Sequence, residues 1–261
     1  MLFRSLIPGS LLFLAPLSSA LPQASTDGFR WQGSLAAGKT IEIIGVNGDI
    51  EAEGTTGRQV EVTASKRARK SDLSTVTFEV VEHADGITIC AMYPATRQGP
   101  NECKPGNKGR MNTSKNDVEV EWSVKVPAGV RLTGRTVNGR IDARNLTAPA
   151  EARTVNGSIS IETAAWADAS TVNGSIVARL GAADWSGEIE FSTVNGGVSL
   201  SLPASTSARV DASNVNGGMR TDFPLTIQGR WGPHRMSGTI GQGGRDLSLS
   251  TVNGTLELRK H

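Results

Sequence analysis

Residues 154–161 read Thr-Val-Asn-Gly-Ser-Ile-Ser-Ile, and the Val-Asn-Gly triplet in this stretch recurs along the chain. It occurs seven times, and each copy can be named by its asparagine: Asn47, Asn138, Asn156, Asn173, Asn195, Asn216 and Asn253. Five copies extend to Thr-Val-Asn-Gly, and most are followed by apolar residues at every second position. From Asn138 to Asn216 successive copies are 18, 17, 22 and 21 residues apart, and the last step is 37 residues. A period of about 20 residues predicts a repeat fold.

Two all-β geometries fit this repeat. Asn-Gly between alternating strands is a strong hairpin signal, and serial hairpins would give a meander or a barrel in which Phe191 faces Leu200. In a β-solenoid, each stretch of 17–22 residues is one coil with Asn-Gly at a corner, and equivalent residues stack about 4.8 Å apart. We favour the solenoid because Val and Asn recur in all seven copies, whereas a hairpin turn also accepts Asp-Gly or Gly-Gly.

The solenoid prediction assigns a role to each residue of the triplet. Stacked asparagines would form a hydrogen-bonded structural ladder, and Asn173→Ala would cost about 1–3 kcal/mol if the amide is buried. Val would fill the same internal slot in every coil. The expected inward residues of one coil are Ile189, Phe191, Val194, Val198, Leu200 and Leu202.

The end of the repeat region departs from the regular spacing. Residues 218–251 are too many for one coil, so we expect residues 236–240 to form a degenerate coil without the triplet. The last copy lies close to the C-terminus. If it forms the terminal coil, the charged residues 259–261 would protect its open strand edge from pairing with another chain.

The N-terminal segment predicts export. Arg4, an apolar stretch at 6–17 and Ser-Ser-Ala at 18–20 are typical of a secretory signal peptide occupying residues 1–20. No later segment has the about 20 apolar residues that a membrane span needs. We expect residues 21–130 to form a less regular β portion and residues 131–261 to form the regular repeats, continuous with it.

The two cysteines, Cys90 and Cys103, are separated by a loop rich in Gly and Pro. In an exported protein such a pair predicts a disulfide, which contributes about 3 kcal/mol for a loop of this length. The formal net charge is +2, with 27 basic and 25 acidic residues. This balance argues against a nucleic-acid partner.

Motifs of enzymes and of metal or cofactor sites are absent from the sequence, so we expect a protein that is not an enzyme and binds no cofactor. An alternative is a carbohydrate-active enzyme with carboxylates from different coils, for which the candidates are Asp142, Glu162, Glu188, Glu190, Asp211 and Asp222. Trp166 and Trp185 fall between coils and are candidates for a ligand surface, since exposed indole rings stack on sugars. Packing against the coils is the competing interpretation. The basic segment at 66–70 is expected to be a loop.

Residues 46–52 (Val-Asn-Gly-Asp-Ile-Glu-Ala), residues 124–130 (Val-Lys-Val-Pro-Ala-Gly-Val) and the serial Thr-Val-Asn-Gly units together resemble the bacterial "putative adhesin" family, a domain of unknown function. The resemblance covers about residues 35–259 and implies a β-solenoid in the cell envelope, in the periplasm or at the surface. It supplies no catalytic residues. The expected function is adhesion or scaffolding towards an envelope polymer or an envelope protein. A periplasmic sensor or accessory protein in envelope stress is a further alternative.

Overall fold

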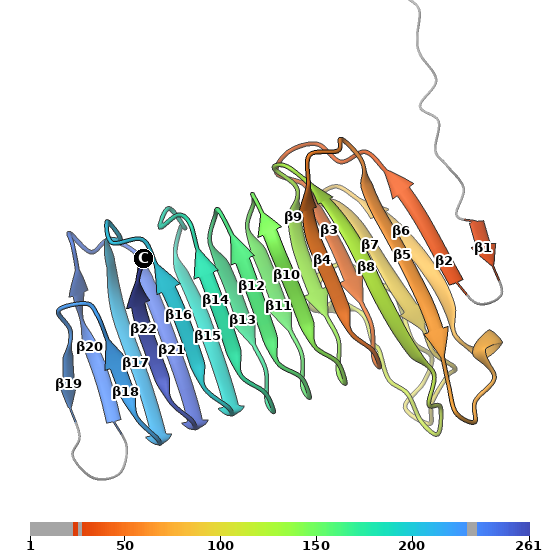
Figure 1. The fold of residues 1–261 in the computed structure, drawn as a ribbon. Helices are drawn as coiled ribbons and strands as arrows, with labels where there is room; N and C mark the ends of the chain where they lie inside the picture. The colour runs from red at the N-terminus through yellow and green to blue at the C-terminus, as the bar shows by residue number, and fades with distance from the viewer. Residues whose placement is uncertain (1–22, 26–27, 229–233) are drawn as a thin grey trace, which may run out of the picture.

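The computed structural model describes residues 23–25, 28–228 and 234–261, and strands make up most of it (Figure 1). The predicted signal peptide lies outside the described residues. In the described ranges, the helices are two short 3₁₀ turns, η1 (Leu73–Thr75) and η2 (Gly106–Lys108). No helix among the described residues is long and apolar enough to span a bilayer. The prediction of an all-β protein is confirmed.

The described strands form two large mixed sheets that pack face to face (Figure 1). Sheet A contains, in spatial order, β1 (Gln23–Ser25), β2 (Gly28–Gly33), β5 (Val60–Arg67), β8 (Glu119–Pro127), β4 (Ile50–Thr55), β10 (Ile141–Leu146), β12 (Ile159–Thr163), β14 (Ile176–Leu180), β16 (Val198–Leu202), β22 (Leu256–Lys260) and β18 (Met219–Thr221). Sheet B contains β19 (Thr226–Gln228), β20 (His234–Ile240), β17 (Ala208–Asn216), β21 (Asp246–Asn253), β15 (Glu188–Asn195), β13 (Ala167–Ser170), β11 (Ala150–Arg153), β9 (Arg131–Arg135), β3 (Thr40–Ile44), β7 (Gly86–Met92) and β6 (Thr77–His83).

Each Val-Asn-Gly triplet joins a strand of sheet B to a strand of sheet A, and we call such a strand–triplet–strand segment a unit. Neighbouring units pair in parallel. Ile159 of β12, for example, lies opposite Ile141 of β10 on one side and Ile176 of β14 on the other. Equivalent residues of successive units therefore lie side by side.

This pairing decides against serial hairpins at the unit that suggested them. Phe191 of β15 pairs with Ala169 and Leu249, and Leu200 of β16 pairs with Ala178 and Leu258. Phe191 and Leu200 thus lie in different sheets instead of facing each other across a turn. The barrel alternative is wrong, because both sheets are open at their ends.

The units do not stack in sequence order. The last unit, β21–β22, lies between β15–β16 and β17–β18 in both sheets. The predicted degenerate coil at 236–240 is wrong, because this segment belongs to β20, which pairs antiparallel with β17 and with β19. Residues 259–261 do not protect an open edge either, because β22 is paired on both sides. The short strands β18 and β19 form the edges at this end, and short edges resist pairing with other chains.

At the other end of the stack, antiparallel strands cover the first unit. The unit β3–β4 pairs in parallel with β9–β10 on one side and with β7 and β8 on the other. Residues 93–118 connect β7 to β8 where other units have a triplet. Strands β6, β5 and β2 then continue the sheets with antiparallel pairing. The predicted irregular portion and the regular portion consequently share both sheets.

The core lies between the sheets, and one expected core position is wrong. Ile189, Phe191, Val198, Leu200 and Leu202 are buried as expected. Val194, in contrast, is 39% exposed. Strand β15 runs on through Asn195, so the alternation of inward and outward residues continues into the triplet. The preceding Thr193 therefore faces the core, and Val194 faces solvent.

Candidate functional site

A threonine precedes five of the seven triplets and ties neighbouring units together inside the core. The hydroxyl group of Thr171 donates to the carbonyl oxygen of Gly157 in the next unit at 2.9 Å, and Thr193 and Thr251 make the equivalent bond at 2.8 Å. These hydroxyls are buried, and a buried hydroxyl is costly unless it is hydrogen-bonded. This pairing explains why Thr-Val-Asn-Gly recurs.

The triplet glycine is required by the close approach of neighbouring units. A Cβ atom built on Gly157 would lie 1.9 Å from the carbonyl oxygen of Gly139 in the adjacent unit. The same contact recurs from Gly174 to Gly157 at 2.1 Å and from Gly254 to Gly196 at 1.9 Å. Any other residue would force the backbones apart.

The asparagines of the triplets form one continuous ladder of side-chain hydrogen bonds. Each Nδ2 donates to the Oδ1 of the neighbour at 2.7–2.9 Å, in the order Asn216, Asn253, Asn195, Asn173, Asn156, Asn138 and Asn47. The Nδ2 atom of Asn47 then donates to the Val118 carbonyl at 3.3 Å. The rungs are exposed to solvent. The structure thus places the asparagines together, but on the surface.

The exposure of the ladder changes the expected cost of losing one rung. Asn173→Ala removes two hydrogen bonds that water can replace, so we expect a loss of less than about 1 kcal/mol. Thr171→Val keeps the side-chain volume but removes the buried donor to Gly157, and should cost about 1–3 kcal/mol. Urea unfolding of the two variants measures both values. A larger loss for Asn173→Ala than for Thr171→Val would contradict this assignment.

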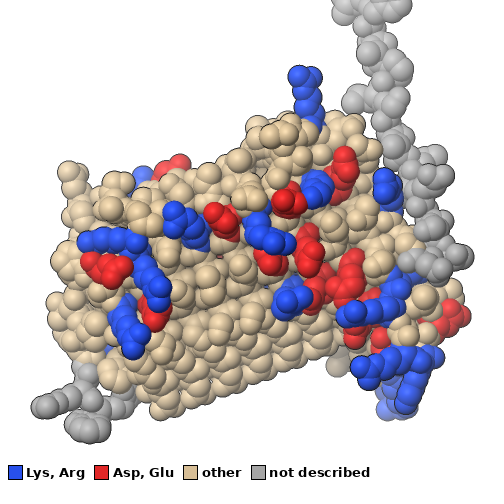
Figure 2. All heavy atoms as spheres, viewed as in Figure 1, with Lys and Arg blue, Asp and Glu red and all other residues tan. Residues whose placement is uncertain are grey.

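Exposed valines run beside the ladder. Val155, Val172, Val194 and Val252 are each 39% exposed and Val215 is 44% exposed. The residue after each glycine is Ser or Thr in three of these units and Gly in the other two: Ser158, Ser175, Thr255, Gly197 and Gly218. We call the exposed Val row and the Asn ladder the corner ridge. In Figure 2 the rim formed by the triplet corners, along the lower edge of the molecule, carries little charge, whereas acidic and basic side chains are scattered over the sheet face.

Residues 93–118, which we call the disulfide loop, border one end of the corner ridge. Cys90 and Cys103 form the predicted disulfide, with Cα atoms 5.9 Å apart. A groove of about 470 Å³ separates the loop from sheet B and is lined by Met111, Asn112, Arg135, Arg153, Val137 and Val155, among others. Tyr93 lies at the same end. Its hydroxyl group donates to the Val118 carbonyl oxygen at 2.8 Å, and burial raises the pKa of Tyr93 to about 12.

A chain of ion pairs runs across sheet B beside this groove. Glu42 is a buried residue, and its carboxylate accepts hydrogen bonds from Thr88 at 2.8 Å, from the Gly106 N–H at 2.9 Å and from Arg135 at 3.1 Å. Arg135 also pairs with Glu151 at 2.9 Å. Every group in this arrangement is already paired, so the row is better suited to hold the loop than to bind an anion.

The carboxylates proposed for catalysis do not gather in one place. Asp142 and Glu162 lie on sheet A, whereas Glu188, Glu190 and Asp211 lie on sheet B. Asp142 pairs with Arg144, Asp211 pairs with Arg235, and Asp222 accepts the Lys260 N–H. Within the described residues, no group of acidic, histidine or cysteine side chains could hold a metal ion.

The two candidate tryptophans are not arranged for stacking on a ligand. Trp185 is 2% exposed, and its indole N–H donates to the Asp246 carbonyl at 3.0 Å, so this ring packs against the units, as the competing interpretation expected. Trp166 is half-buried and packs against the core. Connections between units fold over the ends of the core, and an apolar ring there is more stable covered than exposed. Trp231 lies outside the described residues.

Asp168 of β13 is a carboxylate that the sequence analysis did not single out. It pairs with Arg153 at 3.2 Å and accepts the Glu190 N–H at 3.0 Å. Burial raises the pKa of Asp168 above its ordinary value. Asp168 lies next to Glu151 because β13 pairs in parallel with β11. The sequence does not specify this pairing.

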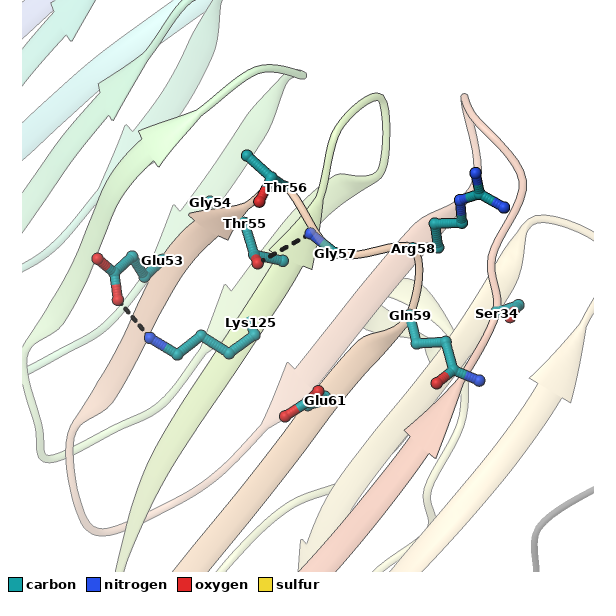
Figure 3. A pocket seen from close by; sticks show the side chains of 10 residues that line it. All are labelled: Ser34, Glu53, Gly54, Thr55, Thr56, Gly57, Arg58, Gln59, Glu61 and Lys125. Atoms are coloured by element: carbon teal, nitrogen blue, oxygen red, sulfur yellow. Dashed lines mark hydrogen bonds and ion pairs between the residues drawn. The ribbon is translucent and has the colours of Figure 1, made fainter.

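A hollow of about 940 Å³ lies where β4 ends and β5 begins (Figure 3). Figure 3 shows Lys125 pointing towards Glu53, with which it forms an ion pair, while Arg58 and Gln59 stand around the rim. A hydrogen bond from Lys125 lowers the pKa of Glu53. The charged groups that line the hollow are thus the paired Lys125 and Glu53, with Arg58 and Glu61.

The basic segment at residues 66–70 lies at a second hollow, where hydrogen bonds to a carboxylate hold its backbone. Lys66 and Arg67 belong to β5, so the prediction of a loop holds only for the residues after them. Asp117 accepts the backbone N–H groups of Arg69, Lys70 and Ser71. Hydrogen bonding from Ser71 and then from the other two residues lowers the pKa of Asp117 to about 2. Arg67, Arg69, Lys70 and Lys115 line this hollow together with Asp117 and Glu119, and Arg67 pairs with Glu119.

Known proteins provide an independent comparison. The family model described as Toastrack DUF4097 matches residues 35–259. Among solved structures, a "putative cell adhesion protein" from Clostridium sporogenes is 11% identical, with a TM-score of 0.45, over 92% of this chain and 100% of that chain. A "putative adhesin" from Bacteroides fragilis is 9% identical, with a TM-score of 0.29, over 91% and 98%. A "putative lipid binding protein" from Parabacteroides distasonis is 9% identical, with a TM-score of 0.22, over 90% and 97%.

No curated protein matches the chain. The family match covers most of the sequence, including every triplet, and the resemblance inferred from the triplets is confirmed. The chain belongs to the Toastrack DUF4097 family.

Proposed function

We propose that the protein is an exported, non-enzymatic component of the bacterial cell envelope, built as a β-solenoid whose corner ridge binds a linear envelope polymer. The observation that carries this proposal is the ridge itself. It repeats one pattern of an exposed valine and an exposed asparagine in five neighbouring units. A linear polymer also repeats one chemical pattern, so the two can meet at several points at once.

Several weak contacts of this kind add up to useful affinity. Contacts on a rigid row act at high effective concentration once the first has formed. Each internal asparagine of the ladder uses one donor and one acceptor in it, while its amide offers two donors and two acceptor sites. The remaining sites are available to hydroxyl and amide groups of a polymer, and the valines supply apolar contact. The disulfide supports export, because such bonds persist in oxidising compartments.

Co-sedimentation with insoluble peptidoglycan, outer-membrane vesicles and whole cells, at low and high salt, tests the proposal. The mature chain from residue 21 should pellet with one of these fractions, and the binding should survive high salt because the ridge carries little charge. The double variant Val172→Glu/Val194→Glu should bind at least about tenfold more weakly, since it places charges in an apolar row.

Val177→Glu is the matched control. Val177 is 55% exposed and lies on β14 of sheet A, outside the rows of valines and asparagines that form the ridge. It should bind like the unmodified chain. Equal binding by the control and the double variant would overturn the ridge assignment. Binding that disappears in high salt would assign the interaction to the basic segment instead, and absence of binding to every fraction would favour a protein partner.

A further inference from the structure

The seven Asn-Gly pairs share one chemical reaction, the loss of the asparagine side-chain nitrogen as ammonia. The backbone nitrogen of a glycine can attack the side-chain carbonyl carbon of the preceding asparagine, because no side chain on glycine obstructs the approach. A carbon–nitrogen bond forms, ammonia leaves with the proton of the amide nitrogen, and a five-membered imide remains. Water then opens the imide at either carbonyl, giving aspartate or isoaspartate. The reaction requires a free glycine N–H and an asparagine side chain that can move.

Six of the seven pairs are held at both groups. The N–H of the glycine donates to the asparagine carbonyl oxygen of the next unit at 2.8–3.0 Å for Gly48, Gly139, Gly157, Gly174, Gly196 and Gly254. In the same six pairs, the asparagine Oδ1 accepts a hydrogen bond from the next rung of the ladder. The attacking nitrogen and the carbonyl under attack are therefore both occupied.

The seventh pair, Asn216-Gly217, lacks both restraints. Its unit is the last in the ladder, and no further triplet lies beyond it among the described residues. The N–H of Gly217 donates to no described residue, and the Oδ1 of Asn216 accepts from none. The side chain of Asn216 keeps one hydrogen bond, from its Nδ2 to the Oδ1 of Asn253 at 2.9 Å, and its backbone carbonyl accepts the Gly254 N–H at 2.8 Å. Asn216 and Gly217 are both exposed to solvent.

We propose that Asn216-Gly217 is a site of spontaneous deamidation, and that the stacking of units protects the other six Asn-Gly pairs. The conversion replaces the Nδ2 of Asn216 with oxygen and so removes the terminal rung to Asn253. It adds a negative charge at one end of the corner ridge, and the isoaspartate product adds a methylene group to the backbone. The change stays at the end of the stack, whereas the same change at Asn173 would remove the rung to Asn156 in the middle of the ladder.

Incubation of the folded chain at mildly alkaline pH, followed by peptide mapping with mass spectrometry and an isoaspartate assay, tests this site. The peptide that contains Asn216 should convert at least about tenfold faster than those containing Asn156, Asn173 and Asn195, because an internal pair must first open locally. The same chain in denaturing urea should convert all seven pairs at similar rates. The variant Asn216→Gln should lose the early isoaspartate signal.

Two outcomes would overturn the proposal. One is a folded chain in which Asn173 or Asn195 converts as fast as Asn216. The other is a folded chain in which Asn216 stays intact over the time in which the urea-unfolded chain converts. Retention of the early signal in Asn216→Gln would place the reactive site elsewhere and would have the same consequence.

Discussion

Gly157→Ala is expected to lower the free energy of unfolding by about 4 kcal/mol or more, because its Cβ atom would overlap backbone that cannot move independently. That atom would lie 1.9 Å from the Gly139 carbonyl oxygen and 2.5 Å from the carbonyl carbon. Both glycines are held by hydrogen bonds to the next unit, so relief requires separating two units. The backbone of Gly157 does not have a positive φ angle, so the effect is steric.

Gly218→Ala is the matched control for this prediction. Gly218 also lies beside a triplet, but a Cβ atom there would meet Thr255 at 3.9 Å, an ordinary contact. Its φ angle is not positive either, and we expect a change of less than about 0.5 kcal/mol. Urea and thermal unfolding followed by circular dichroism compare the two variants. Similar losses for both would mean that glycine is needed for a reason other than the approach of the units.

Arg135→Leu is expected to cost about 3–5 kcal/mol, because it leaves the buried carboxylate of Glu42 without its charged partner. The side chain of Glu42 is 5% exposed and that of Arg135 is 17% exposed. Arg144→Leu is the control, because Arg144 pairs with Asp142 at the surface, and its loss should cost less than about 1 kcal/mol. Unfolding in urea gives both values.

A second substitution tests the cause. Glu42→Gln in the Arg135→Leu background removes the buried charge, so it should recover part of the lost stability, and the coupling follows from a double-mutant cycle. No recovery would show that Arg135 stabilises the protein through its packing. The N–H of Gly106 also donates to Glu42, so the first variant should loosen the disulfide loop as well.

Local patterns were sufficient for the fold class and for the residues that recur. Alternation along residues 198–202 predicts a strand, and the repeated triplet predicts stacked asparagines, because both patterns depend on near neighbours in the chain. The pairing of Cys90 with Cys103 was equally accessible, since the chain has no other cysteine. The same local reasoning gave the wrong orientation for Val194, which was expected to face the core. The alternation that buries Ile189 and Phe191 also buries Thr193, and following it one residue further would have placed Val194 outside.

The candidate site was harder to predict, because its residues come together through pairing between units. Asp168 and Glu151 become neighbours only when β11 and β13 pair in register. Whether an aromatic residue in a connection is covered depends on which segments cross it, and for Trp185 the carbonyl of Asp246 and the side chain of Arg245 lie against it. These partners are about 60 residues away in the chain and carry no signal near Trp185 in the sequence.

The sequence by itself determined the all-β class, the triplet corners and the disulfide, since these depend on alternation, recurrence and the presence of two cysteines. The tertiary structure decided the order of the units, and with it the position of the last one between β15–β16 and β17–β18. Units with the same triplet present nearly equivalent edges, so local chemistry does not distinguish one neighbour from another. Strand β20 occupies one edge of β17 by antiparallel pairing, which leaves the other edge of β17 for β21. That choice also leaves Asn216, instead of Asn253, at the open end of the ladder.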